Sequence, residues 1–528
     1  MRTIVAAVLL AMLSGLAPTA KADEPVPSTK ECVDGRQTED PMSPPCVGSF
    51  DGDNGGATST GVTRDEIRVL LYLDAGCQNS ECPPTEDRYR IIDFNRPVRE
   101  PCPRTYPVAG QKCDYMAFRL ARGFTRYFND RFMTYGRRVH LYAYISGATT
   151  AAQRKADAAG LFDALKPFAV LDQAVFQGYN DAFVDAMAAR GVTVFATPAA
   201  LTETLMARND PMVWSFWPSV ERQATAYADY VCSRIAALPA RHAGSPELNG
   251  RQRRFGLLYT TDPSRPELHA FREVAKEGLR ACGAFWAAEG TFTPAGWDVR
   301  VSVPLNAIEA VRKFQESEVT TVLWLGGVTN WFSRAASAHG YFPEIVLAPD
   351  FHLETNASGR VQDQTVWRNA WGLQTQLRMD GGAHDISSRA LDEGSGGATD
   401  EERRYAPDVY RDFFQLFTAV QLAGPLLAPE SVRDGFRALP AVSSTDPYRA
   451  ACSYPHGDFG CVDDAMEVWW DPTGSAPDQS APGCMRMVQG GVRRVIGDWP
   501  VADEVFGNPS DPCTAYDGSR KVDPSPSL

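Results

Sequence analysis

The chain has 528 residues, of which 44% are hydrophobic and 22% are charged. This composition is that of a globular protein, and it excludes a wholly disordered, collagenous or coiled-coil chain. A chain of this length can bury a large core and is expected to divide into two or more domains. The 65 acidic residues outnumber the 52 basic residues, and the resulting formal net charge of −13 argues against nucleic acid or an anionic membrane as a partner.

The first 22 residues are typical of a signal peptide. Arg2 precedes an apolar run over 4–16, and Ala20-Lys21-Ala22 has the small-x-small form of a cleavage site. The apolar run is shorter than the roughly 20 residues that cross a bilayer. The first cysteine, Cys32, lies well beyond the cleavage site, so no lipid anchor is indicated. We therefore expect export to the periplasm, the cell envelope or the extracellular space.

Twelve cysteines in an exported chain predict up to six disulfides. A metal site is not expected, because the cysteines and the seven histidines form no metal-binding pattern. Short spacings favour local pairs, although spacing alone leaves the connectivity open. The expected pairs are Cys32–Cys46, Cys77–Cys82, Cys102–Cys113, Cys452–Cys461 and Cys484–Cys513, with Cys232 and Cys282 joining two helices of one lobe.

The N-terminal part of the mature chain is expected to be irregular. Residues 23–61 are rich in Pro, Gly, Asp and Ser and read as a leader. A strand is predicted over 67–72 and a helix over 115–132, where Phe118, Leu120, Phe124 and Phe128 recur at helical spacing. Residues 75–113 between them exceed an ordinary strand-to-helix loop and are interpreted as a cysteine-rich insertion.

Strands and helices then alternate along the chain. The first run has expected strands at 139–144, 168–171, 192–196 and 213–217 and helices at 151–165, 180–190 and 220–238. The second run has expected strands at 255–259, 285–288, 320–325 and 345–348 and helices at 267–281, 306–316 and 331–339. Such alternation, with strands that are apolar on both faces, builds parallel sheets covered by helices. Two runs predict an α/β protein with two lobes.

The last part of the chain has a different pattern. It predicts a strand over 366–373, a loop over 380–400, a helical pair at 405–423 and 429–439, and a hairpin of 466–470 with 492–496. We expect residues 62–216 and 366–440 to form lobe 1, and residues 217–350 and 441–500 to form lobe 2. Residues 501–528 are expected to be a C-terminal tail.

Signatures of catalysis are not found in the sequence. It contains no G-x-S-x-G elbow, no Walker loop, no G-x-G-x-x-G after a strand and no H-E-x-x-H. Asp51-Gly52-Asp53-Asn54-Gly55 lacks the glutamate that completes a calcium loop, and a Gly/Asp turn is the better interpretation. A protein that binds without a cofactor, rather than an enzyme, is expected.

Four stretches resemble a known family. Residues 61–69 resemble its opening strand, 135–139 its second strand, Thr197-Pro198-Ala199-Ala200 its ligand-contacting turn, and 324–327 with Ala348-Pro349-Asp350 the strand ends of its second lobe. The family is the type I periplasmic binding proteins, specifically the leucine/isoleucine/valine-binding branch that serves ABC transporters. The resemblance spans about residues 61–439. It implies two Rossmann-like lobes with parallel sheets, joined by crossover hinge strands that close over a ligand, to which this chain adds disulfide-rich insertions.

The resemblance also implies a ligand site. In this family the turn and a loop after the preceding strand hold a carboxylate, and an acidic residue of the second lobe takes an ammonium group. The corresponding ligand-binding candidates are Gln173, Phe176, Ala199, Ala200, Thr202, Gly327, Thr329 and Asp350. Leu201 replaces the family's hydroxyl residue, Val328 and Thr329 replace an aromatic one, and no stacking tyrosine is found around 262–265. An amino acid and a larger or less polar ligand therefore both stay open.

The leading interpretation is an exported solute-binding protein that delivers a small molecule, such as an amino acid, an amide or a related metabolite, to a membrane ABC permease. It is expected to act as a monomer or weak dimer. A ligand sensor of the same fold that signals to a membrane receptor, an envelope protein without a transport role, and an enzyme with an unseen site stay open.

Overall fold

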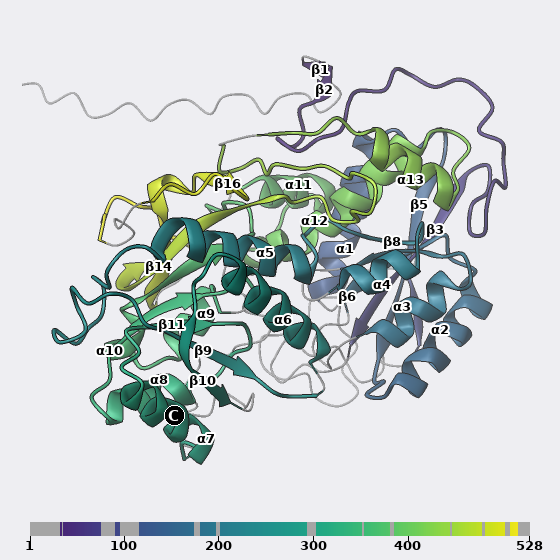
Figure 1. Ribbon diagram of the computed structural model, residues 1–528. Coiled ribbons are helices and arrows are strands. Elements are labelled where there is room, and N and C mark those ends of the chain that lie inside the picture. Colours follow the sequence, from purple (N-terminus) through teal and green to yellow (C-terminus); the bar gives the residue numbers. More distant parts are fainter. Residues whose placement is uncertain are drawn as a thin grey trace, which may run out of the picture.

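The computed structural model describes residues 32–33, 35–74, 90–94, 116–173, 180–196, 201–263, 265–292, 302–350, 353–380, 385–443, 446–477, 481–501 and 507–515. Within these residues, two large sheets are each covered by helices, and a short ribbon of β1 (Cys32–Val33) and β2 (Arg36–Gln37) stands apart from both. The first sheet and its helices lie at the right of Figure 1, and the second sheet with its helices lies at the left.

The first sheet has the strand order β4-β5-β3-β6-β7-β8. Its strands are β3 (Glu66–Asp74), β4 (Ile91–Asp93), β5 (Arg138–Ser146), β6 (Ala169–Gln173), β7 (Thr193–Ala196) and β8 (Val213–Ser215). All neighbours run parallel except β4, which pairs antiparallel with β5. Every residue of β6 and β7 is buried, because helices cover both faces. These helices include α1 (Met116–Arg131), α2 (Ala151–Leu165), α3 (Asp181–Ala188) and α4 (Glu203–Arg208).

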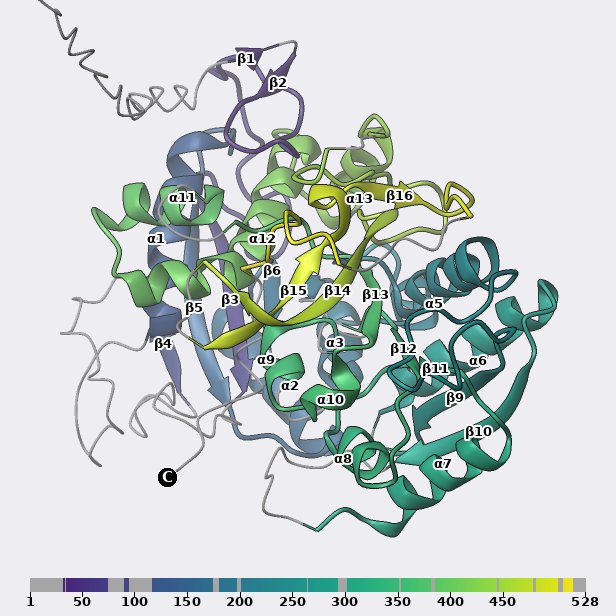
Figure 2. The same ribbon diagram turned by 90° about the vertical axis from the view of Figure 1, so that its left-hand side faces the viewer.

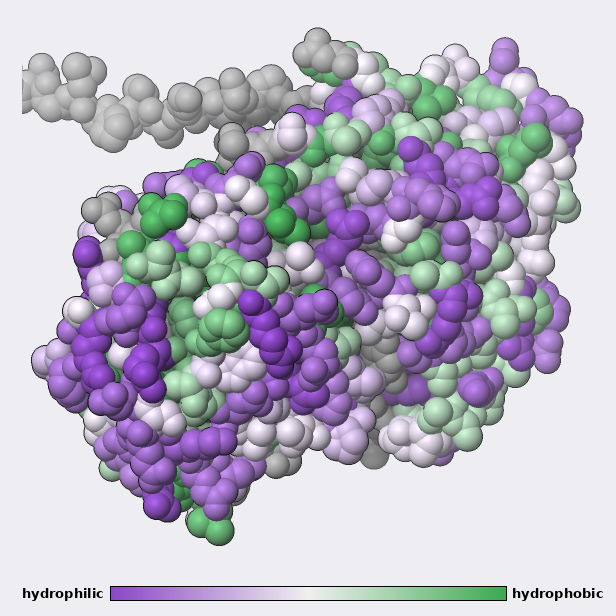
Figure 3. Space-filling model, viewed as in Figure 1, coloured by the Kyte–Doolittle hydropathy of each residue, from purple (hydrophilic) through white to green (hydrophobic). Residues whose placement is uncertain are grey.

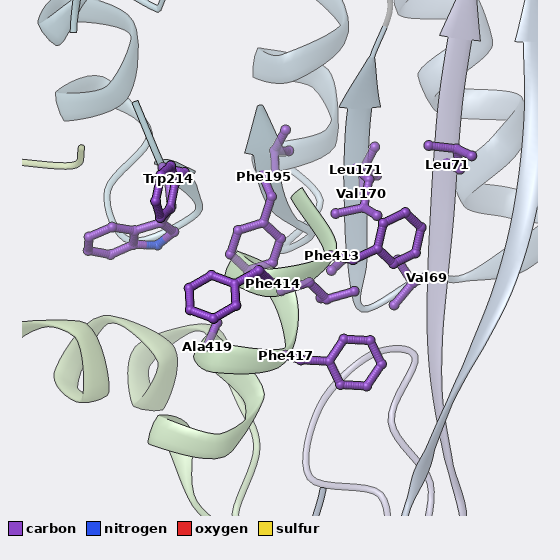
Figure 4. Close-up of a cluster of buried hydrophobic side chains, with 14 of the residues drawn as sticks. Val69, Leu71, Val170, Leu171, Phe195, Trp214, Phe413, Phe414, Phe417 and Ala419 are labelled. Atoms are coloured by element: carbon purple, nitrogen blue, oxygen red, sulfur yellow. The ribbon is translucent and has the colours of Figure 1, made fainter. Parts of the chain in front are cut away.

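A later segment returns to the first sheet. It comprises α11 (Ile386–Ser395), α12 (Asp400–Ala423) and α13 (Pro429–Ala438). Phe413, Phe414 and Phe417 of α12 are buried in the same core as the apolar side chains of β3, β6, β7 and β8, as Figure 4 shows. Burying three phenylalanine side chains contributes several kcal/mol in total, at about 1.5–3 kcal/mol for each side chain. Helix α12 is therefore an integral part of the first lobe.

The second sheet has the order β10-β9-β11-β12-β13-β14-β15, with β16 also paired to β14. Its strands are β9 (Phe255–Thr260), β10 (Trp286–Phe292), β11 (Thr321–Trp324), β12 (Glu344–Leu347), β13 (Ala370–Gln374), β14 (Asp464–Ser475), β15 (Pro482–Met487) and β16 (Arg493–Val495). The strands from β10 to β13 run parallel, and β14, β15 and β16 pair antiparallel. Figure 2 shows β13, β12, β11 and β9 following one another across the second lobe.

Two hydrophobic clusters cover the two faces of the second sheet. Leu257 and Leu323 pack in the cluster of α5 (Val220–Tyr230), its π-helical continuation (Val231–Ile235) and α6 (Pro266–Ala281). Leu258 and Trp324, the next residues along the same strands, pack in the cluster of α7 (Leu305–Glu316) and α8 (Trp331–Ala338). Since successive strand residues point to opposite faces, α5 and α6 cover one face and α7 and α8 the other. Short helices α9 (Asn356–Arg360), α10 (Gln364–Trp367) and a 3-10 turn (Val488–Gly490) complete the lobe.

The sequence-based prediction of the C-terminal part was wrong in three places. Residues 366–373 were expected to be a strand of lobe 1, but α10 precedes β13, and β13 pairs with β12 and β14 in the second sheet. The expected loop over 380–400 contains α11. The expected hairpin partners do pair, as β14 with β16, but β15 intervenes and extends the same sheet.

Four of the expected disulfides are present, namely Cys32–Cys46, Cys232–Cys282, Cys452–Cys461 and Cys484–Cys513. The last one fastens part of the expected tail to the second sheet, where Thr514 also donates its backbone N–H to the carbonyl of Met485 at 2.9 Å. The expected pairs Cys77–Cys82 and Cys102–Cys113, like the signal peptide over 1–22, lie outside the described residues.

The surface of the described part gives no sign of membrane insertion by a helix. Among the described residues, no helix combines the length and the apolar character that a membrane crossing requires. On the face shown in Figure 3, hydrophilic residues predominate and hydrophobic residues are scattered between them.

Three crossovers connect the two sheets, after β8, after β13 and before β14. The first and third run side by side, because Ser215 N–H donates to the carbonyl of Phe459 at 2.9 Å and Val462 N–H donates to that of Phe216 at 3.1 Å. The second and third are joined by the fully buried Arg493, which donates to the carbonyl of Gln376 at 2.6 Å and pairs with Asp464 at 2.8 Å. The carboxyl ends of β8 and β13 therefore both border these crossovers.

Candidate functional site

The strand order marks one place at the carboxyl edge of each sheet where a ligand crevice is expected. In an open parallel sheet, a ligand crevice forms where two neighbouring strands send their following helices to opposite faces. In the first sheet this point lies between β3 and β6, because β3 leads through α1 to β5 on one side and β6 leads through α3 to β7 on the other. Right-handed crossovers in opposite directions place α1 and α3 on opposite faces. In the second sheet it lies between β9 and β11, because α6 and α8 cover opposite faces.

In the second sheet, two glycines follow β11 at this point. Gly326 and Gly327 have φ of +87° and +76°, a backbone conformation that other residues adopt only with strain. Space is also restricted, because a Cβ at Gly326 would lie 2.9 Å from Leu268 and a Cβ at Gly327 would lie 3.3 Å from Phe292. The chain after β11 thus packs directly against the first turn of α6 and the end of β10.

Asp350 holds this glycine turn in place. Its carboxylate accepts the backbone N–H of Gly327 at 2.6 Å and that of Leu353 at 2.7 Å. The indole N–H of Trp324 donates to the carbonyl of Gly327 at 2.8 Å. Asp350 therefore links the chain after β11 to the chain after β12, and both of its oxygens already accept a backbone hydrogen bond.

Two further residues of this loop, Thr329 and Asn330, are buried and polar. The hydroxyl of Thr329 accepts the backbone N–H of Trp331 at 3.1 Å, and its carbonyl accepts from the side chain of Gln362 at 3.1 Å. Asn330 is 1% exposed, yet neither atom of its side-chain amide makes a hydrogen bond with any residue that the structure describes. Buried amides are nearly always hydrogen-bonded, so Asn330 marks a place where a polar partner is missing.

An ion pair follows β9 on the other side of the crevice. Arg265 precedes the first turn of α6, and its carbonyl accepts the N–H of Leu268 at 3.1 Å. Its guanidinium Nε donates to the carboxylate of Glu267, whose side chain is 4% exposed while that of Arg265 is 26% exposed. The two terminal nitrogens of Arg265 make no hydrogen bond with the described residues, and the side chain is partly exposed.

The first sheet contributes Gln173, the last residue of β6. It is buried, and its side-chain amide donates to the carboxylate of Asp412 of α12 at 2.6 Å. Thr202 caps α4, since its hydroxyl accepts the N–H of Leu205 at 3.2 Å. Phe176, Ala199 and Ala200 lie outside the described residues.

The structure thus brings Gly327, Thr329 and Asp350 together, on the carboxyl edge of the second sheet, and places Gln173 on that of the first. Sequence reasoning missed Arg265, Glu267 and Asn330. A signal for them was present, because Arg265 and Asn330 lie in the strand-to-helix connections that follow β9 and β11, and Glu267 lies in the first turn of α6. Recognising it required the strand order of the second sheet, which a local pattern does not provide.

A charged cluster lies where the first and third crossovers meet. Arg222 of α5 contacts Asp458 at 2.9 Å and Asp463 at 3.4 Å on the third crossover, and Glu203 of α4 at 3.7 Å. Burial, together with the nearby carboxylates of Asp458 and Asp464, raises the pKa of Asp463 to about 6, although the hydroxyl of Ser453 and the charge of Arg222 oppose this shift. The cluster joins an element of each lobe to a crossover.

No protein-family model matches the sequence, and no curated protein matches it.

Comparison with solved structures finds similar folds at low sequence identity. A solute-binding protein of an ABC transporter from Rhodopseudomonas palustris HaA2, in complex with p-hydroxybenzoic acid, is 11% identical with a TM-score of 0.52, over 82% of this chain and 98% of that chain. A leucine-, isoleucine-, valine-, threonine- and alanine-binding protein from Brucella ovis, in a closed conformation, is 9% identical with a TM-score of 0.52, over 84% and 99%. A type 1 periplasmic binding protein from Bordetella pertussis Tohama I is 11% identical with a TM-score of 0.50, over 80% and 99%.

Proposed function

Because this chain has the fold of the type I periplasmic binding proteins, we propose that it is an exported solute-binding protein that delivers a small molecule to a membrane ABC permease. The observation that carries the proposal is the strand order, which fixes the positions of the two expected crevices. Each lies at the carboxyl edge of its sheet, and both edges border the three crossovers. A small molecule held between these edges would contact both lobes, so that binding and lobe closure are coupled.

The proposal includes capture without chemical change. The polar groups at the second crevice are backbone amides, one side-chain amide, one guanidinium and carboxylates that are already hydrogen-bonded or ion-paired. Such a set favours recognition of a polar group. The chain is proposed to act in the periplasm or cell envelope as a monomer or weak dimer.

A thermal-shift screen of the mature protein tests this function. Amino acids, amides, ureas and aromatic acids are added separately, and the unfolding temperature is measured. A true ligand at 100 times its Kd adds about 2.7 kcal/mol to the free energy of unfolding and raises the unfolding temperature. Mass spectrometry of the ligand after release should return it unchanged. The proposal is rejected if no compound stabilises the protein or if the bound compound is converted.

A further inference from the structure

We propose that Arg265 binds an acidic group of the solute from the second lobe, and that the solute is therefore an organic acid. This inference rests on the proposed function, because it concerns the chemistry of the same site. It differs from what the family resemblance implies, namely that the carboxylate of Asp350 in the second lobe binds an ammonium group of the ligand.

The position of Arg265 supports this role. It lies in the connection between β9 and α6, and the neighbouring connection from β11 to α8 runs to the opposite face. The first turn of α6 touches the glycine turn through Leu268, which would meet a Cβ at Gly326 at 2.9 Å. Arg265 thus stands at the edge of the second crevice, where a ligand of an open parallel sheet binds.

The hydrogen bonds of the guanidinium support it as well. Glu267 accepts from Nε, which orients the planar group and leaves both terminal nitrogens without a partner among the described residues. Two parallel N–H groups match the two oxygens of a carboxylate, and such charge-assisted pairs are stronger than neutral hydrogen bonds. Because Glu267 is almost completely buried and Arg265 is partly exposed, the pair presents its positive end outward.

Asn330 supplies a second, independent indication of a polar ligand. Its amide is buried on the other side of the same crevice and has no partner among the described residues. The amide N–H donates to an oxygen of an acid or of a hydroxyl group, and the amide oxygen accepts from a hydroxyl. The carboxylate of Asp350, in contrast, already accepts two backbone N–H groups within the second lobe.

The test compares acids with their neutral amides on matched variants. The probes are 4-hydroxybenzoate, succinate, glutamate and leucine, each beside the corresponding amide, and their affinities are measured by calorimetry on the mature protein. We expect at least one acid to bind and its amide to bind much more weakly. Arg265→Gln should weaken the acid by about ten- to a hundredfold, the effect of removing a hydrogen bond to a charged group, and Arg265→Lys should weaken it less.

The control is Arg272→Gln, further along α6, where the guanidinium pairs with Glu273 at 2.6 Å and lies 4.9 Å from the ring of Tyr259. It should bind the acid as the wild type does. Asn330→Ala should weaken the same acid, and circular dichroism should show that each variant is folded.

Three results would overturn the inference. If a probe binds but Arg265→Gln leaves its affinity unchanged, Arg265 does not contact the ligand, while the proposed function stands. If only amides or amines bind, the solute is not an acid, and again only this inference fails. If no probe or screened compound binds the wild-type protein, the proposed function fails and this inference fails with it.

Discussion

At the scale of single residues, Asp350 illustrates how one carboxylate can hold two loops together. Resemblance implies that it takes an ammonium group, and the structure shows it accepting hydrogen bonds from Gly327 and Leu353 at 2.6 and 2.7 Å. Both the glycine turn after β11 and the loop after β12 depend on these hydrogen bonds. Asp350 therefore sets the shape of the carboxyl edge of the second sheet.

Asp350→Asn is expected to destabilise the protein in the absence of any ligand. The substituted amide has one accepting oxygen and an NH₂ group, so one of the two buried backbone N–H groups loses its acceptor. An unsatisfied buried donor costs about 1–3 kcal/mol. Urea unfolding should show this decrease in the free energy of unfolding, and Asp65→Asn, at an exposed carboxylate, should show none. Equal stability of both variants would contradict the role assigned to Asp350.

Several site residues could be predicted from the sequence, and others could not. Gly327, Thr329 and Asp350 follow strands that the apolar pattern indicates, and the structure places them in one loop region. Arg265 and Asn330 are single polar residues in ordinary connections, so nothing local distinguishes them. Their proposed role follows from the order β10-β9-β11, a property of non-local strand pairing.

At the scale of elements, the alternation of strands and helices in each lobe was predictable, because buried parallel strands are apolar on both faces. Helix α11 was not, since Ser387, Ser388 and Gly394 gave its segment the composition of a loop. The helix forms because Leu391 packs against α1, where a Cβ added at Gly123 would lie 2.7 Å from the Leu391 side chain. Strand β15 begins with Pro482 and Gly483, two residues that are uncommon in strands, so the sequence pattern did not predict it either. Tertiary packing outweighed local propensity in both segments.

The disulfide Cys232–Cys282 joins the π-helical turn after α5 to the end of α6, across a sequence separation of 50 residues. Removing it frees a long loop in the unfolded chain, and closing such a loop contributes about 4 kcal/mol in the chain-entropy model. We expect the double variant Cys232→Ser/Cys282→Ser to lose about 2–4 kcal/mol of unfolding free energy in urea. An unchanged midpoint and slope would show that α5 and α6 are held by packing alone.

The crossover cluster makes stability depend on pH. The pKa of Asp463 is about 6 in the folded protein against 3.8 as the ordinary value, so the folded protein binds a proton that the unfolded chain releases between these values. Its contribution to stability is therefore greatest below about pH 4 and is lost as the pH rises through 6. Besides Arg222, the charged groups facing Asp463 are Asp458 and Asp464.

Asp463→Asn should remove this dependence, because the amide stays neutral at every pH. Relative to the wild type, we expect the variant to gain about 2 kcal/mol of unfolding free energy between pH 4.5 and 7.5. Urea unfolding at both pH values measures this difference. The control is Asp163→Asn, because the Asp163 side chain is 78% exposed. Its free energy of unfolding relative to the wild type should differ little between the two pH values. A difference of the opposite sign would show that the ion pair with Arg222 dominates.

At the scale of the whole molecule, the proposed function depends on movement of the two lobes about the crossovers. Glu203 belongs to the first lobe, Arg222 to the second, and Asp458 to a crossover, so their contacts must change if the lobes rotate. Arg493, in contrast, is fully buried between the second and third crossovers and fixes their spacing. Motion is therefore expected at the pair formed by the first and third crossovers.

Gly460→Ala tests this hinge without touching the proposed ligand contacts. A Cβ at Gly460 would lie 2.6 Å from the carbonyl oxygen of Trp217 and 3.2 Å from Cα of Pro218, so the two crossover strands must move apart. Overpacking of this kind costs about 1–3 kcal/mol of stability. The substitution should also change the balance of open and closed forms of the protein. The affinity for an acid that binds the wild type should then fall in proportion to the fraction of protein molecules that can close.

The control is Gly160→Ala in α2, where a Cβ meets nothing within 4 Å. Calorimetry should show weaker binding by Gly460→Ala and unchanged binding by Gly160→Ala. Small-angle X-ray scattering should show a smaller decrease in the radius of gyration on ligand addition for Gly460→Ala than for the wild type, because a strained hinge closes less completely. If Gly460→Ala loses stability but keeps both the affinity and the full decrease in radius, closure does not take place at the contact of the first and third crossovers. The hinge would then have to lie in the second crossover, beside the carbonyls of Thr375 and Gln376 that Arg493 binds.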